Sequence, residues 1–212
     1  MVRHPRARRY LLHLRQDGTV RVTIPRHGTV SAARDFAARN AGWLEQQLRR
    51  LAAQPKLPAA WPVGTEILFR GEAVRIELDA DDLVSFGTER VKVSEAPADM
   101  RPAIQKYLRQ QAAQELPARV MELATRHGVN VTRVTVRNQK SRWGSCSRRG
   151  TISLNWRLIQ TPVFVRDYII LHELAHRRQM NHSDKFWQEV ARLCPDYLQA
   201  KRWVKQNAGM LR

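Results

Sequence analysis

The alternation of hydrophobic and polar positions makes the first half of the chain rich in predicted strands. Apolar residues alternate with polar ones on both sides of the turn signal Asp17-Gly18, which predicts a β-hairpin over residues 11–24. A helical stripe of apolar residues follows from Ser31 to about Gln54. Residues 65–93 contain four short apolar runs separated by turn-forming residues, which we interpret as strands.

The period of the pattern changes from two to about 3.6 residues in the second half. It predicts a helix from about Met100 to His127, in which Pro117 produces a kink or a division into two helices. Two strands are expected next, the first around residues 134–136 and the second over 152–158, where the apolar residues alternate cleanly. Further helices are predicted roughly over residues 162–180, 184–194 and 196–207.

These elements predict an α+β fold in two parts. The length of 212 residues suits one domain with a smaller appendage. Residues 1–98 form the expected β-rich N-terminal region with one helix, which need not fold independently, and residues 99–212 form the second domain. The stretch 54–62 contains three prolines and is a candidate linker.

Composition excludes several classes of protein. Hydrophobic residues make up 43% of the chain and charged residues 26%, which is typical of globular proteins and excludes a disordered or collagen-like chain. No run of about 18 apolar residues predicts a membrane span. We expect no secretory signal, because no apolar segment follows the basic N-terminus. The two cysteines, Cys146 and Cys194, lie far apart and favour a reducing cytoplasm.

The formal net charge is +18, which favours a polyanionic partner. Residues 1–60 carry 12 basic and 3 acidic side chains, residues 61–130 carry 9 and 11, and residues 131–212 carry 16 and 5. Both ends are therefore basic and the middle is nearly neutral. A GC-rich genome is the alternative explanation, since arginine outnumbers lysine 30 to 7.

The most specific motif is His172-Glu173-Leu174-Ala175-His176, with a third histidine at His182. Residues four apart on a helix lie on one face, so His172 and His176 can bind the same zinc ion. Glu173 then lies where a general base is needed. A catalytic zinc site takes three protein ligands, and the chain can turn at Asn181 to bring His182 to the metal. The pentapeptide alone also occurs by chance in helical proteins, but the third histidine and the apolar helix favour the zinc site.

The motifs as a set resemble the YgjP-like metal-dependent hydrolases, a family related to the SprT-like and WLM zinc peptidases. The resemblance rests on the histidine motif, on Asn181-His182-Ser183 and Phe186-Trp187, and on two upstream strings, residues 142–147 (RWGSCS) and residues 154–158 (LNWRL). The hairpin with Asp17-Gly18 and the helix with Trp43 also fit, so the resemblance covers nearly the whole chain.

This resemblance implies a zincin-like core, with a small sheet, the HExxH helix and C-terminal helices, in residues 99–212. It implies that His172, His176 and His182 bind Zn²⁺ and that Glu173 is the catalytic carboxylate. Residues 1–98 would then be a β-rich extension that covers the site or recognises substrate.

The RWGSC segment allows several interpretations. The strands of residues 132–158 include a candidate edge strand for binding an extended peptide. Arg142 is a second candidate catalytic residue, because it can stabilise an oxyanion or hold a carboxylate or phosphate. Trp143 and Gly144 are better explained as a tight structural turn, and Cys146 is a minor candidate for an additional metal ligand. Phe186 and Trp187 are expected to pack against the core.

The favoured function is a zinc-dependent metallopeptidase acting on peptides or proteins in the cytoplasm. One alternative is a metal-dependent nucleotide pyrophosphatase, since some members of the resembling family act on UTP. A second is a SprT-like protease recruited to nucleic acid by its positive charge. A purely structural zinc module is disfavoured, because structural sites usually have four protein ligands.

Overall fold

The computed structural model describes residues 1–15, 17–53, 60–79, 83–93 and 98–211. Helices and small sheets are both present, so the predicted α+β class is confirmed. Most of the candidate linker falls outside the described residues. In the described part of the chain, no helix combines the length and the apolar character that crossing a membrane requires.

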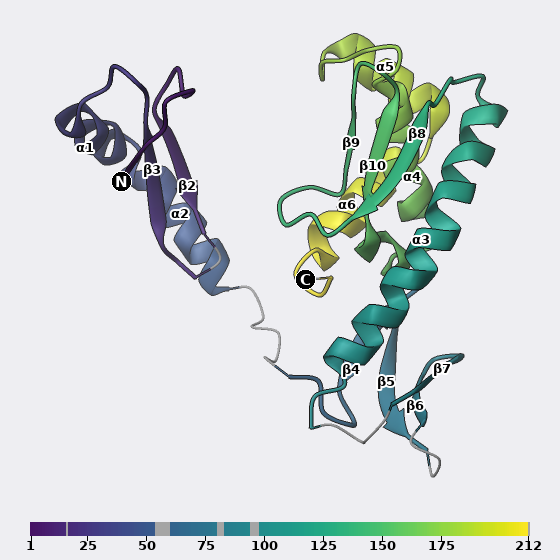
Figure 1. Ribbon diagram of the computed structural model, residues 1–212. Helices are drawn as coiled ribbons and strands as arrows, with labels where there is room; N and C mark the ends of the chain where they lie inside the picture. The colour runs from purple at the N-terminus through teal and green to yellow at the C-terminus, as the bar shows by residue number, and fades with distance from the viewer. Residues whose placement is uncertain (16, 54–59, 80–82, 94–97, 212) are drawn as a thin grey trace. The chain divides into compact units, whose positions relative to one another are not determined.

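The first of two compact units comprises Met1–Lys56 and combines one sheet with two helices. Its sheet has the order β1-β3-β2, in which β1 is parallel and β2 antiparallel to β3. Figure 1 labels β2 and β3 side by side. Its small core contains Val22, Ile24 and Ala33. The elements are β1 (Val2–Arg3), β2 (Leu11–Leu14), β3 (Val20–Ile24), α1 (Val30–Arg39) and α2 (Ala41–Ala52).

The single helix predicted over residues 31–54 is wrong, because the chain breaks at Asn40. In an unbroken helix the Asn40 N–H would donate to the carbonyl of Phe36. Instead the Asn40 side-chain amide donates to Phe36 O at 2.7 Å, and the Asn40 N–H donates to Ala37 O at 3.1 Å. The asparagine side chain thus competes with the backbone and ends the first helix.

The second unit, Leu57–Arg212, contains two sheets and the remaining helices. Helix α3 reaches from one sheet to the other without interruption at Pro117, because buried residues on its inner face hold it on both sides of the proline (Figure 1). The elements are β4 (Glu66–Phe69), β5 (Glu72–Leu78), β6 (Leu83–Phe86), β7 (Glu89–Lys92), α3 (Arg101–Arg126), β8 (Arg133–Arg137), β9 (Gly144–Cys146), β10 (Thr151–Asn155), the 3-10 helix η1 (Trp156–Gln160), α4 (Val163–Ala175), α5 (Asp184–Leu193) and α6 (Tyr197–Asn207).

The antiparallel sheet β4-β5-β6-β7 belongs to the second unit, which corrects the predicted boundary at residues 98 and 99. Its buried residues share one core with α3, where Phe86 packs edge-on against Tyr107. The Tyr107 hydroxyl donates a hydrogen bond to Glu89 of β7. The sheet therefore stabilises the helix that leads to the metal-binding motif, and the separate unit ends at residue 56.

The second sheet has the order β8-β10-β9, with β10 parallel to β8 and antiparallel to β9. The predicted strand over residues 152–158 ends earlier than expected, at Asn155. The Asn155 carboxamide oxygen accepts from the Arg157 N–H at 3.2 Å, which caps the 3-10 helix η1. Trp156 and Leu158 are buried in this helix rather than in a strand. The small sheet, the helix α4 and the C-terminal helices form the predicted core.

Candidate metal centre

Helix α4 carries His172 and Glu173, and His176 is its C-cap. The helix is almost wholly buried, because its apolar residues pack against β9, β10 and the C-terminal helices. His172 and His176 are one turn apart, so their rings lie on the same side of the helix, with ring centroids 5.2 Å apart. The helical spacing thus places His176 at a buried position and His172 at a partly buried one.

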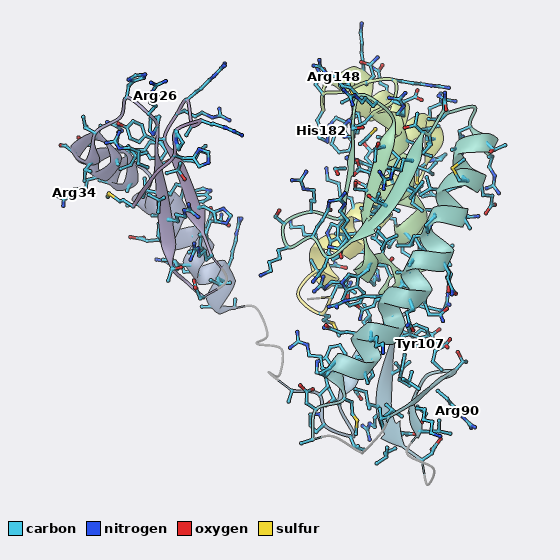
Figure 2. The ribbon with its side chains drawn as sticks, in the orientation of Figure 1. Arg26, Arg34, Arg90, Tyr107, Arg148 and His182 are labelled. Atoms are coloured by element: carbon cyan, nitrogen blue, oxygen red, sulfur yellow. The ribbon has the colours of Figure 1, made fainter. Side chains whose placement is uncertain are left out.

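The chain turns after α4 and brings His182 back to the other two histidines. Helix α4 ends at Ala175, and the carbonyl of this residue accepts from the N–H groups of both Arg178 and Gln179 in the turn that follows. His182 comes just before Ser183, the N-cap of α5. Its ring lies 5.2 Å from His172 and 4.8 Å from His176, measured between centroids. The structure therefore brings together the three histidines singled out in the sequence, at the end of the second unit away from Tyr107 (Figure 2).

The ring nitrogens of the three histidines suit a metal ion. One ligand atom from each lies within 4.8 Å of the others, and Nε2 of His172 is 3.2 Å from Nε2 of His182. Two nitrogens bound to one tetrahedral zinc at 2.0–2.1 Å would be about 3.3 Å apart. Nδ1 of His176 lies 3.1 Å from Gln179 O, and a proton donated there leaves Nε2 free to bind a metal. Nδ1 of His172 is buried without a partner, so its Nε2 is the nitrogen available to a ligand.

The Phe186 ring packs against all three imidazoles. Its side chain is fully buried, and its ring centroid lies 4.5–4.9 Å from the centroids of all three histidines. Trp187 lies at the side, 5.8 Å from His172 and 6.0 Å from His182. Both aromatic residues also pack against the core, as expected. The Phe186 ring restricts the orientation of the imidazoles and excludes water from the side that it covers.

The environment favours uncharged imidazoles. Burial, together with the charges of the other two histidines and Lys201, lowers the pKa of His172 to about 4. Burial also lowers the pKa of His176, although its bond to Gln179 opposes this shift. Neutral imidazole is the form that binds metals, so these two rings need not lose a proton to bind one at neutral pH.

Glu173 lies beside the histidines, with Gly144 of β9 directly over its carboxylate. The Glu173 side chain is buried, and burial raises its pKa to about 8, against the opposing charge of Arg142. A Cβ atom at Gly144 would lie 2.5 Å from Oε1 of Glu173 and 2.6 Å from its Cγ. The predicted turn at Trp143-Gly144 is therefore wrong for Gly144, which begins a strand and leaves space for the carboxylate.

A cavity of about 290 Å³ opens onto these residues. Arg142 lines it together with the three histidines, Glu173 and Met180. The loop that carries Arg142 is fixed by the buried Asn155, whose amide donates to Gln139 O at 2.8 Å and to Arg142 O at 3.2 Å. The sequence singled out Arg142 but gave no role to Asn155. The only signal was its place at the end of a predicted strand.

Cys146 lines the same cavity but is not part of the histidine cluster. Among the described residues, the group able to hold a metal consists of the three histidines alone. The Cys146 thiol lies 3.4 Å from Ser147 O, and burial raises the pKa of this thiol. A raised pKa disfavours the thiolate, which is the form that binds zinc. The remaining four histidines lie elsewhere in the described chain, on exposed or partly exposed positions: His4, His13, His27 and His127.

Comparison with known proteins identifies a family. A family model described as a YgjP-like metallopeptidase domain matches residues 8–207. Part of the chain is similar to the crystal structure of the metallopeptidase zymogen abylysin of Pyrococcus abyssi, with 26% identity over 43% of this chain and 90% of that one, at a TM-score of 0.37. The zymogen jannalysin of Methanocaldococcus jannaschii shows 24% identity over 44% of this chain and 98% of that one, also at 0.37. No curated protein sequence matches.

Proposed function

The chain belongs to the YgjP-like metallopeptidase family, and we propose that it is a zinc-dependent peptidase whose metal is bound by His172, His176 and His182. This proposal rests on one observation: three imidazoles and one buried carboxylate line the same cavity. Three protein ligands leave a coordination position open, as catalytic zinc sites require.

Zinc is the metal that this donor set favours. Three neutral nitrogen donors suit zinc, whereas Mg²⁺ and Ca²⁺ prefer oxygen ligands. When bound, zinc polarises a carbonyl group and makes a water molecule acidic near neutral pH. The spacing of 3.2 Å between the Nε2 atoms of His172 and His182 supports a shared ion, because it is close to the separation of two nitrogens bound to one tetrahedral zinc.

Glu173 is the proposed general base and acid. Its carboxylate accepts a proton from the attacking water and delivers it to the leaving amine. Burial supports this role, because it raises the pKa of Glu173 toward the neutral range, in which one group can both accept and deliver a proton. Gly144 keeps the space above the carboxylate open.

The edge strand β9 is the proposed site for the substrate backbone. It pairs with β10 on one side only and contributes Gly144, Ser145 and Cys146 to the cavity. An extended peptide can add to such an edge through main-chain hydrogen bonds. Arg142, on the loop two residues before this strand, is placed to bind a carboxylate or to stabilise a developing oxyanion.

Hydrolysis of a nucleotide is the second candidate, and the observation that favours it is Arg142. A guanidinium in the cavity can bind a phosphate, and a metal-activated water can attack phosphorus. However, Glu173 is the only carboxylate that lines the cavity in the described chain. Phosphate-transferring enzymes more often hold Mg²⁺ with carboxylates, so we favour the peptidase.

A paired assay separates these candidates. The purified full-length chain, supplied with one equivalent of zinc, is incubated with a casein-type substrate and with a nucleotide panel that includes UTP. We expect cleavage of casein that a chelator abolishes and added zinc restores. Hydrolysis of UTP without cleavage of casein would contradict the peptidase proposal and support a nucleotide pyrophosphatase.

A further inference from the structure

A second cavity lies outside the metal centre, in the first unit. It has a volume of about 630 Å³ and opens between the segment before β2 and the loop after β3. Arg6, Arg8, Arg26 and His27 line it, and no acidic residue does. All three arginines are exposed, and Arg26 is on the loop that follows β3 (Figure 2). The cavity is therefore a concave, cationic surface.

The first unit leaves its positive charge unneutralised. Residues 1–56 contain 12 basic and 3 acidic side chains, a net charge of +9. In the described part of the chain every ion pair lies in the second unit, between residues 66 and 192. Asp17 and Asp35 are the nearest acids along the chain to the lining residues; Asp17 accepts two hydrogen bonds from Thr19, and neither forms one of these ion pairs. The guanidinium groups at the cavity thus have no carboxylate to neutralise them.

Hydrogen bonds hold the two walls of the cavity together. The His4 N–H donates to Ile24 O at 3.0 Å, and the Arg26 N–H donates to Ala7 O at 3.4 Å. The guanidinium of Arg3 donates to Arg26 O at 2.9 Å, which adds a further positive charge to the wall. These bonds fix the backbone from which Arg6, Arg8 and Arg26 extend, so the cationic surface exists before a ligand binds.

Tyr10 and Gly28 fix the inner end of the cavity. The Thr29 N–H donates to the Tyr10 hydroxyl at 2.9 Å, which connects the cavity to the N-cap of α1. A Cβ at Gly28 would lie 2.6 Å from this hydroxyl and 2.9 Å from the Pro25 ring. The loop after β3 can therefore close against Tyr10 only with glycine at this position.

We propose that the first unit is a nucleic-acid-binding module and that this cavity receives backbone phosphates. Arginine pairs well with phosphate through its planar fork of N–H donors. A polymer fits better than a single phosphate, because Arg6, Arg8 and Arg26 line one open cavity and Arg3 adds a fourth guanidinium at its wall. Binding would depend on phosphates rather than on base sequence.

A lipid surface fits the cavity less well than a nucleic acid. Binding to a membrane interface combines basic residues with protruding apolar side chains. None of the large apolar residues that are exposed in the described part of this unit, such as Val30, Trp43 and Leu48, lines the cavity. The cavity lining instead consists of three arginines, two prolines, Ala7, Gly28, Tyr10 and His27.

The test measures binding of the full-length chain to a fluorescein-labelled 20-base-pair DNA duplex and to the same sequence as RNA, by fluorescence anisotropy between 50 and 200 mM NaCl. The cavity variant is Arg6→Gln/Arg8→Gln/Arg26→Gln. The matched control is Arg34→Gln/Arg39→Gln/Arg50→Gln, which removes the same charge from α1 and α2 of the same unit.

We expect the wild-type chain to bind the duplexes with a Kd in the micromolar range or lower at 50 mM NaCl. The Kd of the cavity variant should be about tenfold higher or more. The slope of log affinity against log salt should fall by about 2.7 in that variant, or about 0.9 for each lost phosphate contact. The control variant should retain most of the affinity and slope. Unchanged cleavage of a short peptide by the cavity variant would show that the protein is still folded and active.

Three results would overturn the proposal. One is no binding of either duplex at 50 mM NaCl. Another is an equal loss in the two triple variants, which would mean that net charge rather than the cavity binds the duplex. The third is binding to phosphatidylcholine–phosphatidylserine vesicles without binding to DNA or RNA. Preference for one of the two duplexes would identify which nucleic acid is the ligand.

Discussion

Gly144 lies directly over the carboxylate of Glu173, so close that a methyl group on the glycine would come within 2.5 Å of Oε1. Gly144 has no left-handed backbone conformation, so space alone requires the glycine. The two residues come from β9 and α4, which are far apart in the sequence but packed together. This contact links the edge strand, where we expect the substrate, to the residue that we expect to transfer the proton.

The first prediction concerns this contact. Gly144→Ala should displace the Glu173 carboxylate and lower kcat tenfold or more, because a small misplacement of a catalytic group is costly. Zinc content should remain at one per chain, since the three histidines are untouched. Gly209→Ala is the control, because a Cβ at Gly209 meets nothing within 4 Å. Full activity in Gly144→Ala would contradict the assigned position of Glu173.

The second prediction separates proton transfer from metal binding. Glu173→Gln keeps the shape of the side chain but removes the base, so turnover should fall by a factor of 100 or more, on the order expected for general acid–base catalysis. Zinc content, measured by elemental analysis, should be unchanged. Glu77→Gln, on an exposed position of β5, should behave as wild type in both measurements. Turnover close to wild type in Glu173→Gln would exclude Glu173 as the base.

The third prediction concerns stability. A ligand at a hundredfold excess over its Kd stabilises the folded state by about 2.7 kcal/mol. For a chain of this size that is a rise in Tm of about 5–10 °C. Zinc should therefore raise the Tm of the metal-free protein, measured by differential scanning calorimetry, and His182→Ala should remove most of the effect.

His13→Ala serves as the control for this experiment, since His13 is exposed on β2 of the first unit. It should retain the full zinc-dependent rise in Tm. If His182→Ala kept the same rise, the third ligand would have to lie elsewhere in the chain.

The fourth prediction concerns the ion pairs that join α3 to its neighbours. Glu115 accepts hydrogen bonds from Arg70 at 2.6 Å and from Arg166, which is buried on α4, at 3.1 Å. Glu115→Gln should lower the free energy of unfolding by about 1–3 kcal/mol, because it leaves a buried guanidinium without its carboxylate. Glu66→Gln breaks an exposed pair with Arg75 and should cost less than about 0.5 kcal/mol.

The free energy of unfolding that Glu115 contributes should depend on pH. Burial alone would raise the pKa of Glu115, but its bonds to Arg70 and Arg166 outweigh this and hold the pKa below the ordinary 4.5. The stabilisation is complete above pH 4.5 and is lost as the pH falls through the lower pKa of the folded state. Urea unfolding should show that the free energy of unfolding differs less between wild type and Glu115→Gln at pH 3.5 than at pH 7. An equal difference at both pH values would contradict the stabilising role of the ionised Glu115 carboxylate.

Local patterns were sufficient to predict the histidine cluster. His172 and His176 are separated by one helical turn, and the apolar residues around them required a buried helix. The strands β4 to β7 also follow directly from short apolar runs between turn residues. In each case the determining interactions are close in the sequence, so a periodic pattern reports them.

Long-range packing explains what the sequence did not reveal. The role of Gly144 depends on a contact with Glu173, almost thirty positions later, and nothing near Gly144 indicates that partner. The first unit ends at residue 56 because the sheet that follows packs against α3, which periodicity cannot show. The break at Asn40 depends on a single hydrogen bond from a side chain that is common in helices and in caps.

The zinc K-edge X-ray absorption spectrum of the zinc-loaded protein tests the central claim most directly. The account predicts three imidazole nitrogens at about 2.0–2.1 Å, with a light oxygen or nitrogen atom completing the coordination, and loss of one imidazole in His182→Ala. A sulfur ligand at about 2.3 Å, which would be Cys146 or Cys194, would contradict it, as would a spectrum unchanged by the loss of His182.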